Sequence, residues 1–420
     1  MRDFIDTSDV EQLQGDVAFE RLPQFLAESD SSEAASDDVR RADSALTTIE
    51  SIERLIAEAD LDHWQPVPVS EHPEVRCVAA QQVETSPCVV CHGTVVTTRF
   101  EIEGVPEKLV VCDGCGVGSL FPMPSPRRIA SFYPAEYYGA AEAKFEPLVE
   151  FGVCLGARLR ARSLMRGVPE GSRVLDIGCG RGVMLKGLLD LGYEAHGVEM
   201  SAAATAGIDP RAQIHIAPDL ADAGFDDNAF DAVILWHVFE HLPQPDRTLD
   251  ELRRIMKPGG RLVIAVPNFA SWQSRSLGAD WFHLDLPRHL YHYTPDALRR
   301  LLNRYEFECR AINHFALLQN PFGWLQSWLN RVTDAPRNSL YSLLHRGGQH
   351  PDLRRMTWRQ RAILKASYRL GLPVAACVSI LEALRQQGGT IAVSATLSDL
   401  QTVDDVVRAA TPANLASAFA

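Results

Sequence analysis

An apolar strand that runs through an acidic residue into glycine at every second position constrains this chain more than any other feature. Residues 174–182 read VLDIGCGRG, with Asp176 followed by glycines at 178, 180 and 182. Glycine adopts a positive φ and lets another group approach the backbone closely. The free N–H groups of a strand-to-helix turn and the helix dipole together attract an anionic ligand group. The run therefore predicts a ligand-binding turn in an α/β fold.

Strands and helices alternate after this turn. We expect a helix over 183–191, then strands over 194–198 and 214–217. The almost continuous apolar run at 230–236 is typical of a strand buried on both faces. A helix around 249–256 and a strand over 261–266 follow. This order predicts a doubly wound, mostly parallel sheet that binds its ligand beyond the carboxyl ends of the strands.

The glycine pattern also separates two classes of nucleotide-binding protein. A dinucleotide fingerprint, G-x-G-x-x-G, needs a third glycine where this chain has Val183. The observed D-x-G-x-G-x-G resembles the first motif of class I S-adenosylmethionine-dependent methyltransferases, and FDAVILWHVFEHL…KPGGRLVIAVPN resembles their second half. The resemblance spans about residues 145–315. It implies an enzyme with a seven-stranded, mostly parallel Rossmann-like sheet, with its sixth strand at 307–312 and an antiparallel seventh strand at 389–394.

Several residues are expected to hold S-adenosylmethionine. Glu199 lies about 20 residues beyond the glycine turn, at the end of the second strand, where a carboxylate can accept hydrogen bonds from a ribose diol. The family resemblance implies that Asp219 and Leu220 hold the adenine, with Asp222 as a rival for the polar contact. The complete set of predicted cofactor residues is Asp176, Gly178, Cys179, Gly180, Gly182, Glu199, Met200, Asp219, Leu220 and His237.

Two C-x-x-C pairs lie upstream of the glycine turn. Cys88 and Cys91 are separated by twenty residues from Cys112 and Cys115, a spacing typical of a four-cysteine zinc ribbon. A redox pair and ordinary buried cysteines are the alternatives. Four thiolates leave no open coordination position, so the Zn²⁺ is expected to be structural. Cys77, His72 and His92 are spare ligands.

Histidines on two segments are candidates for a catalytic base. The loop at 278–294 carries His289 and His292 beside an Asp and an Arg, and Thr294 is expected to cap a helix over 295–302. Histidine is the usual general base near neutral pH. The predicted order is His289, then His292, with His241 and His237 as rivals, and His237 could instead line the sulfonium end of the cofactor pocket. A purely structural hydrogen bond is the alternative for each.

Charge divides the chain unevenly. Residues 1–62 hold seventeen acids against five arginines, a net charge of −12 in a chain of −13. Residues 28–38 have the composition of a disordered segment, and 46–56 carry one apolar helical stripe. We expect an acidic extension over 1–75, which could bind a protein partner, a ribbon and linker over 80–135, and a methyltransferase domain over 145–315 plus 388–398. The acidic balance argues against nucleic acid binding.

Residues 316–387 are expected to form a helical insertion or lid. Its apolar run at 370–381 is shorter than the roughly 20 residues needed to cross a bilayer. Basic charge beside apolar helices predicts either contact of 320–385 with a membrane surface or lipid-linked substrate, or packing on the domain or a dimer mate. Nine cysteines without an N-terminal signal pattern indicate a cytoplasmic setting.

The sequence therefore predicts methyl transfer to a small-molecule or lipid-linked acceptor, such as a sugar, a polyketide-like compound or a quinol. The alternatives are a non-catalytic module that binds S-adenosylmethionine and recruits partners, and a methyltransferase of RNA or protein. The sequence does not distinguish an oxygen, nitrogen or carbon acceptor.

Overall fold

The computed structural model describes residues 75–133, 147–316, 318–344, 353–354 and 356–398. The chain divides into two units, Met1–Pro66 and Val67–Ala420, and the described residues all belong to the second. The expectations for the acidic extension and for His72 lie outside the described residues.

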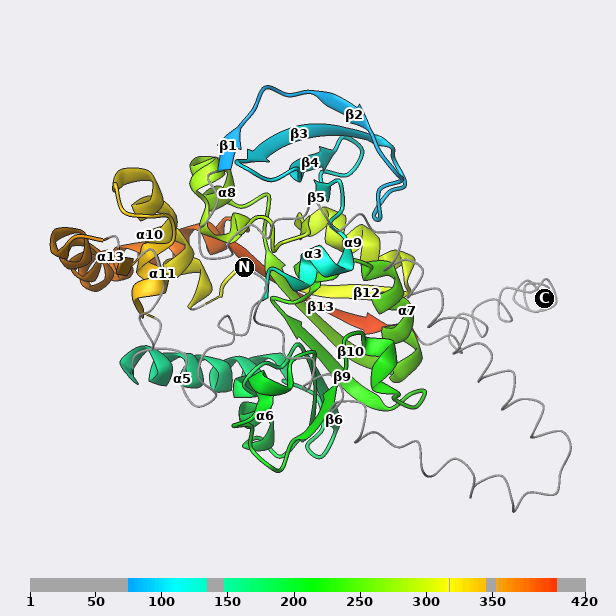
Figure 1. Ribbon diagram of the computed structural model, residues 1–420. Coiled ribbons are helices and arrows are strands. Elements are labelled where there is room, and N and C mark those ends of the chain that lie inside the picture. The colour runs from blue at the N-terminus through cyan, green and yellow to red at the C-terminus, as the bar shows by residue number, and fades with distance from the viewer. Residues whose placement is uncertain (1–74, 134–146, 317, 345–352, 355, 399–420) are drawn as a thin grey trace, which may run out of the picture. The chain divides into compact units, whose positions relative to one another are not determined.

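A seven-stranded mixed sheet forms the centre of the second unit (Figure 1). Its order is β12-β13-β10-β9-β6-β7-β8, and β13 runs antiparallel to both of its neighbours. This topology confirms the predicted doubly wound methyltransferase fold. In chain order the strands are β6 (Arg173–Ile177), β7 (Glu194–Glu199), β8 (Gln213–Ile216), β9 (Phe230–Trp236), β10 (Met256–Pro267), β12 (Phe307–Asn313) and β13 (Thr390–Leu397).

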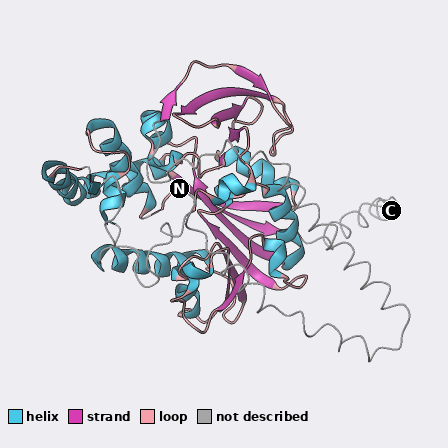
Figure 2. Cartoon of the chain, viewed as in Figure 1, coloured by secondary structure: helices cyan, strands magenta, loops and turns pink. Residues whose placement is uncertain are grey.

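Helices cover both faces of this sheet (Figure 2), and the strand sequences show why. On β9, Val233 and Leu235 pack in one apolar cluster with α7 (Pro245–Ile255) and α9 (Pro295–Arg304). The alternate residues Ala232 and Ile234 pack in the other cluster with α5 (Pro147–Leu164) and α6 (Val183–Leu189). Each large apolar side chain buried in this way contributes about 1.5–3 kcal/mol. The two-sided burial explains the unbroken apolar run.

The starts of α9 and β10 can be compared with the predicted ones. The side chain of Thr294 accepts a hydrogen bond from the backbone N–H of Ala297, which confirms the predicted cap of α9. Strand β10 begins at Met256, five residues before the predicted start. Residues 257–260, which separate the predicted helix from the predicted strand, form an irregularity in the pairing of β10 with β9, where the register shifts between Met256 and Arg261.

A second sheet carries the cysteine pairs. Its strands are β1 (Val75–Cys77), β2 (Gln82–Glu84), β3 (Val95–Ile102), β4 (Lys108–Cys112), β5 (Gly118–Phe121) and β11 (Tyr291–His292). Strand β11 comes from the loop after β10 and pairs antiparallel with β5. The short helix α3 (Pro126–Ala130) follows β5, and α8 (Trp272–Leu277) follows β10. The ribbon is therefore hydrogen-bonded to the loop that holds His289 and His292.

Three described helices lie between β12 and β13, where the sequence predicts an insertion. They are α10 (Gln319–Val332), α11 (Ser339–Leu344) and α13 (Trp358–Leu384). A small apolar core of their own includes Leu325, Leu340 and Leu364.

Candidate active site and metal centre

The glycine turn between β6 and α6 has the backbone that its sequence predicts. Gly178, Gly180 and Gly182 all have positive φ, at 66°, 51° and 71°. A Cβ at Gly178 would lie 2.5 Å from Cγ2 of Val238, whereas a Cβ at Gly180 would meet no atom within 4 Å. A Cβ at Gly182 would lie 2.9 Å from Ile208, so the turn has two crowded glycines, while Gly180 leaves its side open for a ligand.

Glu199 lies beside this turn at the end of β7. Its buried carboxylate accepts hydrogen bonds from the backbone N–H groups of Gly180 at 3.0 Å, Met200 at 2.9 Å and Ser201 at 3.2 Å. These three bonds fix the carboxylate, and its two oxygens together offer about four acceptor positions. A ribose hydroxyl can therefore bind without displacing a backbone donor, and the exposed side chain of Met200 lies next to it.

The proposed adenine residues follow β8. Asp219 caps the short helix Leu220–Ala223 by accepting from the N–H of Ala221 at 3.1 Å, and its other oxygen lies 3.6 Å from Arg247. Leu220 is buried and Asp222 is exposed. The capping bond gives the Asp219 side chain a fixed orientation. The adenine contact itself remains a prediction for both acids.

Arg160 on α5 is a site residue that the sequence analysis missed. Its guanidinium carbon lies 3.9 Å from the centre of the Trp236 ring at the end of β9. Burial lowers the pKa of Arg160 to about 10, which the charge of Asp176 opposes. Burial likewise raises the pKa of Asp176 to about 7, and the cation of Arg160 opposes that shift. A guanidinium is well suited to bind the carboxylate of an amino acid. Three arginines on α5 look alike in sequence, so only the fold singles this one out.

Three of the four candidate histidines have a ring nitrogen that is hydrogen-bonded to a backbone carbonyl. Nδ1 of His289 donates to the carbonyl of His283 at 2.9 Å, and Nδ1 of His241 lies 3.0 Å from that of Arg288. Nε2 of His292 donates to the carbonyl of Leu284 at 2.9 Å. Because a carbonyl only accepts, the bonded nitrogen carries the proton of the neutral ring. Each second nitrogen is thereby left with the lone pair that a base requires.

These histidines differ in how deeply their rings are buried. Burial lowers the pKa of His292 to about 4 and the pKa of His289 well below its usual range. Both rings are buried, whereas His241, on the short helix Phe239–His241 after β9, is half-buried. The rings of His241 and His289 meet edge to face at 4.7 Å, and the hydroxyl of Tyr133 lies 2.9 Å from Nδ1 of His241. The structure therefore brings His241 and His289 together and places His292 in β11.

Glu240 and His283 complete this polar cluster. His283 is the third histidine of the loop at 278–294, whereas Glu240 was not singled out from the sequence. Burial raises the pKa of Glu240 to about 7, and its Oε1 lies 3.1 Å from Nδ1 of His237. His237 has a positive φ of 55° and stacks on His283 at 5.8 Å. Glu240, His241 and His289 offer ligand atoms within 4.8 Å of one another, a set that could hold a metal ion. Glu240 could have been predicted from its position, because it precedes His241 just after a strand that is buried on both faces.

The four predicted zinc ligands converge. Sγ of Cys88 lies 3.6 Å from Sγ of Cys115, and Sγ of Cys91 lies 3.5 Å from Sγ of Cys112. Zn–S bonds of about 2.3 Å in a tetrahedron place sulfurs about 3.8 Å apart, while a disulfide would need about 2.05 Å. The spacing therefore fits a metal and excludes disulfide bonds between these pairs.

The two C-x-x-C turns have the same backbone. The residue after each pair, His92 or Gly116, has a positive φ and donates its N–H to the carbonyl of the first cysteine at 2.8 Å. His92 thus serves as a turn residue, and nothing in this geometry calls for it as a spare ligand. The four thiols fit a zinc ribbon.

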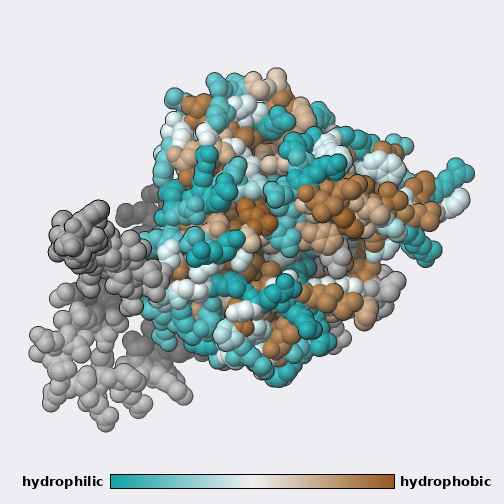
Figure 3. Space-filling model, turned by 180° about the vertical axis from the view of Figure 1, so that it is seen from behind, coloured by the Kyte–Doolittle hydropathy of each residue, from teal (hydrophilic) through white to brown (hydrophobic). Residues whose placement is uncertain are grey.

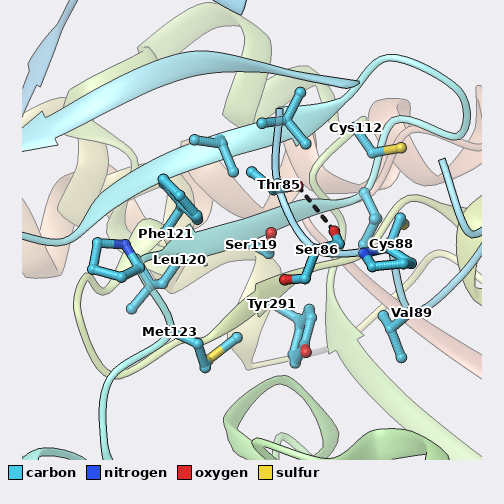
Figure 4. A pocket seen from close by; sticks show the side chains of 15 residues that line it. Thr85, Ser86, Cys88, Val89, Cys112, Ser119, Leu120, Phe121, Met123 and Tyr291 are labelled. Atoms are coloured by element: carbon cyan, nitrogen blue, oxygen red, sulfur yellow. Dashed lines mark hydrogen bonds between the residues drawn. The ribbon is translucent and has the colours of Figure 1, made fainter. Parts of the chain in front are cut away.

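A cavity of about 360 Å³ lies in the ribbon, between the Cys88 turn and strands β4 and β5 (Figure 4). Ser119, Met123 and Tyr291 line it together with Cys88 and Cys112. None of its lining residues belongs to the glycine turn or the histidine cluster. It is therefore separate from the cofactor site.

The sheet order, the glycine turn and the fixed carboxylate of Glu199 together define a class I S-adenosylmethionine-dependent methyltransferase. A family model described as a methyltransferase domain matches residues 154–312. The chain belongs to this family and is an enzyme of that class.

Curated relatives carry a more specific name. A ubiquinone biosynthesis O-methyltransferase of Cereibacter sphaeroides is 30% identical over 232 residues, which cover 48% of this chain and 89% of that protein. An enzyme of the same name from Xanthomonas oryzae is 26% identical over 188 residues, 42% of this chain and 75% of that one. Among solved structures, an S-adenosylmethionine-dependent methyltransferase from Archaeoglobus fulgidus is 22% identical with a TM-score of 0.36, over 57% of this chain and 94% of that one.

Proposed function

We propose that this enzyme methylates a hydroxyl oxygen of a small phenol- or quinol-like acceptor and that His241 is the base. The observation that carries the proposal is the half-buried ring of His241, whose Nδ1 is bonded to the carbonyl of Arg288. Nε2 is thereby free to take a proton directly after the carboxyl end of β9. The name of the curated relatives supports oxygen over nitrogen or carbon as the acceptor atom.

The cofactor supplies an activated methyl group on its sulfonium. The residues of this chain fit it: Glu199 would hold the ribose, Arg160 would bind the methionyl carboxylate, and the open side of Gly180 leaves room at the turn. Orientation of this kind can contribute up to roughly 7–11 kcal/mol to lowering the barrier. His241 then removes the hydroxyl proton, worth about 10²–10⁴-fold in rate.

His241 replaces His289 at the head of the predicted order. His289 and His292 are buried, and a strongly lowered pKa means a weak affinity for the proton that a base must take. We assign His289 a positioning role against His241, whose ring it contacts. His237, which hydrogen-bonds to Glu240, is assigned to the wall of the pocket.

The remaining assignments are proposals of the same kind. We propose that the four cysteine thiols hold a structural Zn²⁺ and that the acceptor carries an apolar or lipid-linked tail, because Trp328 and Val332 of α10 expose apolar surface. None of the nine cysteines is in a disulfide bond, which supports a reducing, cytoplasmic compartment. Membership in an enzyme family argues against the non-catalytic alternative, and the name of the curated relatives described above favours a small-molecule acceptor over nucleic acid or protein.

Methyl transfer from labelled S-adenosylmethionine to a panel of phenols, quinols, amines and carbon acids tests the proposal. We expect transfer to a hydroxyl, a turnover loss of about 10²–10⁴-fold in His241→Ala, and unchanged cofactor binding by calorimetry. His292→Gln is the matched control and should retain activity. Transfer only to amines or carbon acids, or full turnover in His241→Ala, would refute it.

A further inference from the structure

Helix α13 is the part of this chain that the methyltransferase fold does not explain. It spans 27 residues, Trp358–Leu384, and lies outside the matched residues 154–312. By length and composition it is apolar enough to cross a membrane, yet only 17% of its most apolar window is buried. An apolar helix that is left this exposed requires a partner for its outer face.

One side of α13 is fixed to the rest of the insertion. Leu364, Ala375 and Ser379 are buried, and a Cβ at Gly371 would lie 2.8 Å from Leu325 of α10. Near its C-terminal end, Glu382 accepts hydrogen bonds from the N–H of Gly389 at 2.6 Å and from Gln273 and Trp324. This anchoring along most of its length fits a helix that lies on a surface better than one that leaves the domain to span a bilayer.

The opposite side of α13 carries an uninterrupted apolar stripe. Its members recur every three or four residues, so they share one helical face. They are all exposed: Ile363, Ala366, Leu370, Val374, Cys377, Leu381 and Leu384. The exposed fraction is 76% at Leu370, 63% at Val374 and 77% at Leu384. Figure 3 shows apolar side chains gathered on the side of the molecule that carries the insertion.

The exposed charged side chains of α13 are all positive. Arg359, Lys365 and Arg369 are exposed in the first half of the helix, Arg361 donates to the carbonyl of Leu353, and the only acid in α13, Glu382, is buried. A parallel second copy of the helix would set these cations against one another, because α13 offers no exposed carboxylate to pair with them. An anionic lipid surface satisfies both the apolar stripe and the cations, which is the pattern of an interfacial helix.

We propose that α13 lies in the plane of an anionic membrane surface, with its Ile363–Leu384 stripe in the interface and with Arg359, Lys365 and Arg369 at the lipid headgroups. The proposal rests on the exposed side chains of α13 and is independent of the acceptor atom and of the base. It would place the site where an acceptor with an apolar tail concentrates.

Co-sedimentation of the full chain with vesicles tests the proposal. We expect binding to vesicles with about 30% phosphatidylglycerol, little binding to pure phosphatidylcholine, and weakening by salt. Val374→Glu should weaken binding at least tenfold, and replacing Arg359, Lys365 and Arg369 by Glu should do the same. Val95→Glu in β3, at a valine that is 40% exposed, is the matched control and should bind like the wild type.

Three outcomes would overturn the proposal. They are absence of binding to anionic vesicles, equal binding of Val374→Glu and wild type, and a dimer in light scattering that Val374→Glu dissociates without any effect on vesicles, which would assign the stripe to a second copy. Val374→Glu should still methylate a water-soluble phenol at the wild-type rate. A failure of lipid binding is thus distinguishable from a failure of the proposed reaction.

Discussion

Replacing Gly178 by alanine should destabilise this enzyme more than the same change at Gly180. Both residues have positive φ, where a non-glycine residue costs about 1–2 kcal/mol. Only at Gly178 would the new Cβ also overlap Val238, at 2.5 Å, which adds about 1–3 kcal/mol. We therefore expect a loss of about 2–5 kcal/mol in the free energy of unfolding for Gly178→Ala and about 1–2 kcal/mol for Gly180→Ala.

Urea unfolding followed by tryptophan fluorescence measures both losses, and a double-mutant cycle with Val238→Ala isolates the overlap. The cycle should return a coupling of about 1–3 kcal/mol for Gly178 and none for Gly180. Calorimetry should show the reverse order for S-adenosylmethionine, because the added methyl of Gly180→Ala occupies the open side of the turn. Equal destabilisation of the two variants, or the absence of coupling to Val238, would refute the assignment of the crowded and open glycines.

Three further predictions concern the cofactor carboxylate, the metal and the buried histidine. Arg160→Lys should weaken S-adenosylmethionine binding about tenfold by calorimetry, since lysine lacks the planar guanidinium that binds a carboxylate through two hydrogen bonds. Arg158, which is exposed on the same helix, provides the control: Arg158→Lys should bind the cofactor like the wild type. Equal cofactor affinities of Arg160→Lys and wild type would contradict the role of Arg160. Elemental analysis should find one zinc per chain, lost in Cys112→Ser and kept in Cys309→Ser of β12; metal-free wild type would rule out the ribbon. Burial lowers the pKa of His292 to about 4. Between about pH 6.5 and pH 4 the unfolded chain therefore binds a proton at this ring that the folded chain does not bind, and the free energy of unfolding decreases as the pH is lowered. His292→Gln removes this loss, so the stability advantage of wild type over variant should shrink by about 1 kcal/mol between pH 6.5 and 5.5. A constant difference would show that the ring is not buried as a neutral group.

Local patterns predicted most of the central sheet. Alternating strands and helices, the capping threonine Thr294 and the two cysteine pairs act over a few residues, so their structure can be inferred without knowing what they pack against. The start of β10 was misplaced because Lys257-Pro258-Gly259-Gly260 has the composition of a turn, whereas Met256, before this segment, pairs with Phe230 of β9 and so extends the strand back across the irregularity.

The order of the histidines could not be predicted in the same way. His289, His292 and His241 are chemically identical in sequence, and their suitability as bases depends on burial and on which nitrogen a carbonyl binds. Those conditions arise only when the loop after β10 folds against the segment after β9 and when β11 joins the ribbon sheet.

The sequence by itself determined the fold class, the glycine turn, the position of Glu199 and the four thiols, because backbone conformation and metal preference are properties of short segments. Only the tertiary structure decided that Arg160 lies over Trp236, that Glu240 joins the histidines, and that α13 turns an apolar face outward. These features depend on contacts between segments far apart in the chain, and burial, the quantity that sets their chemistry, does not exist until the segments have packed.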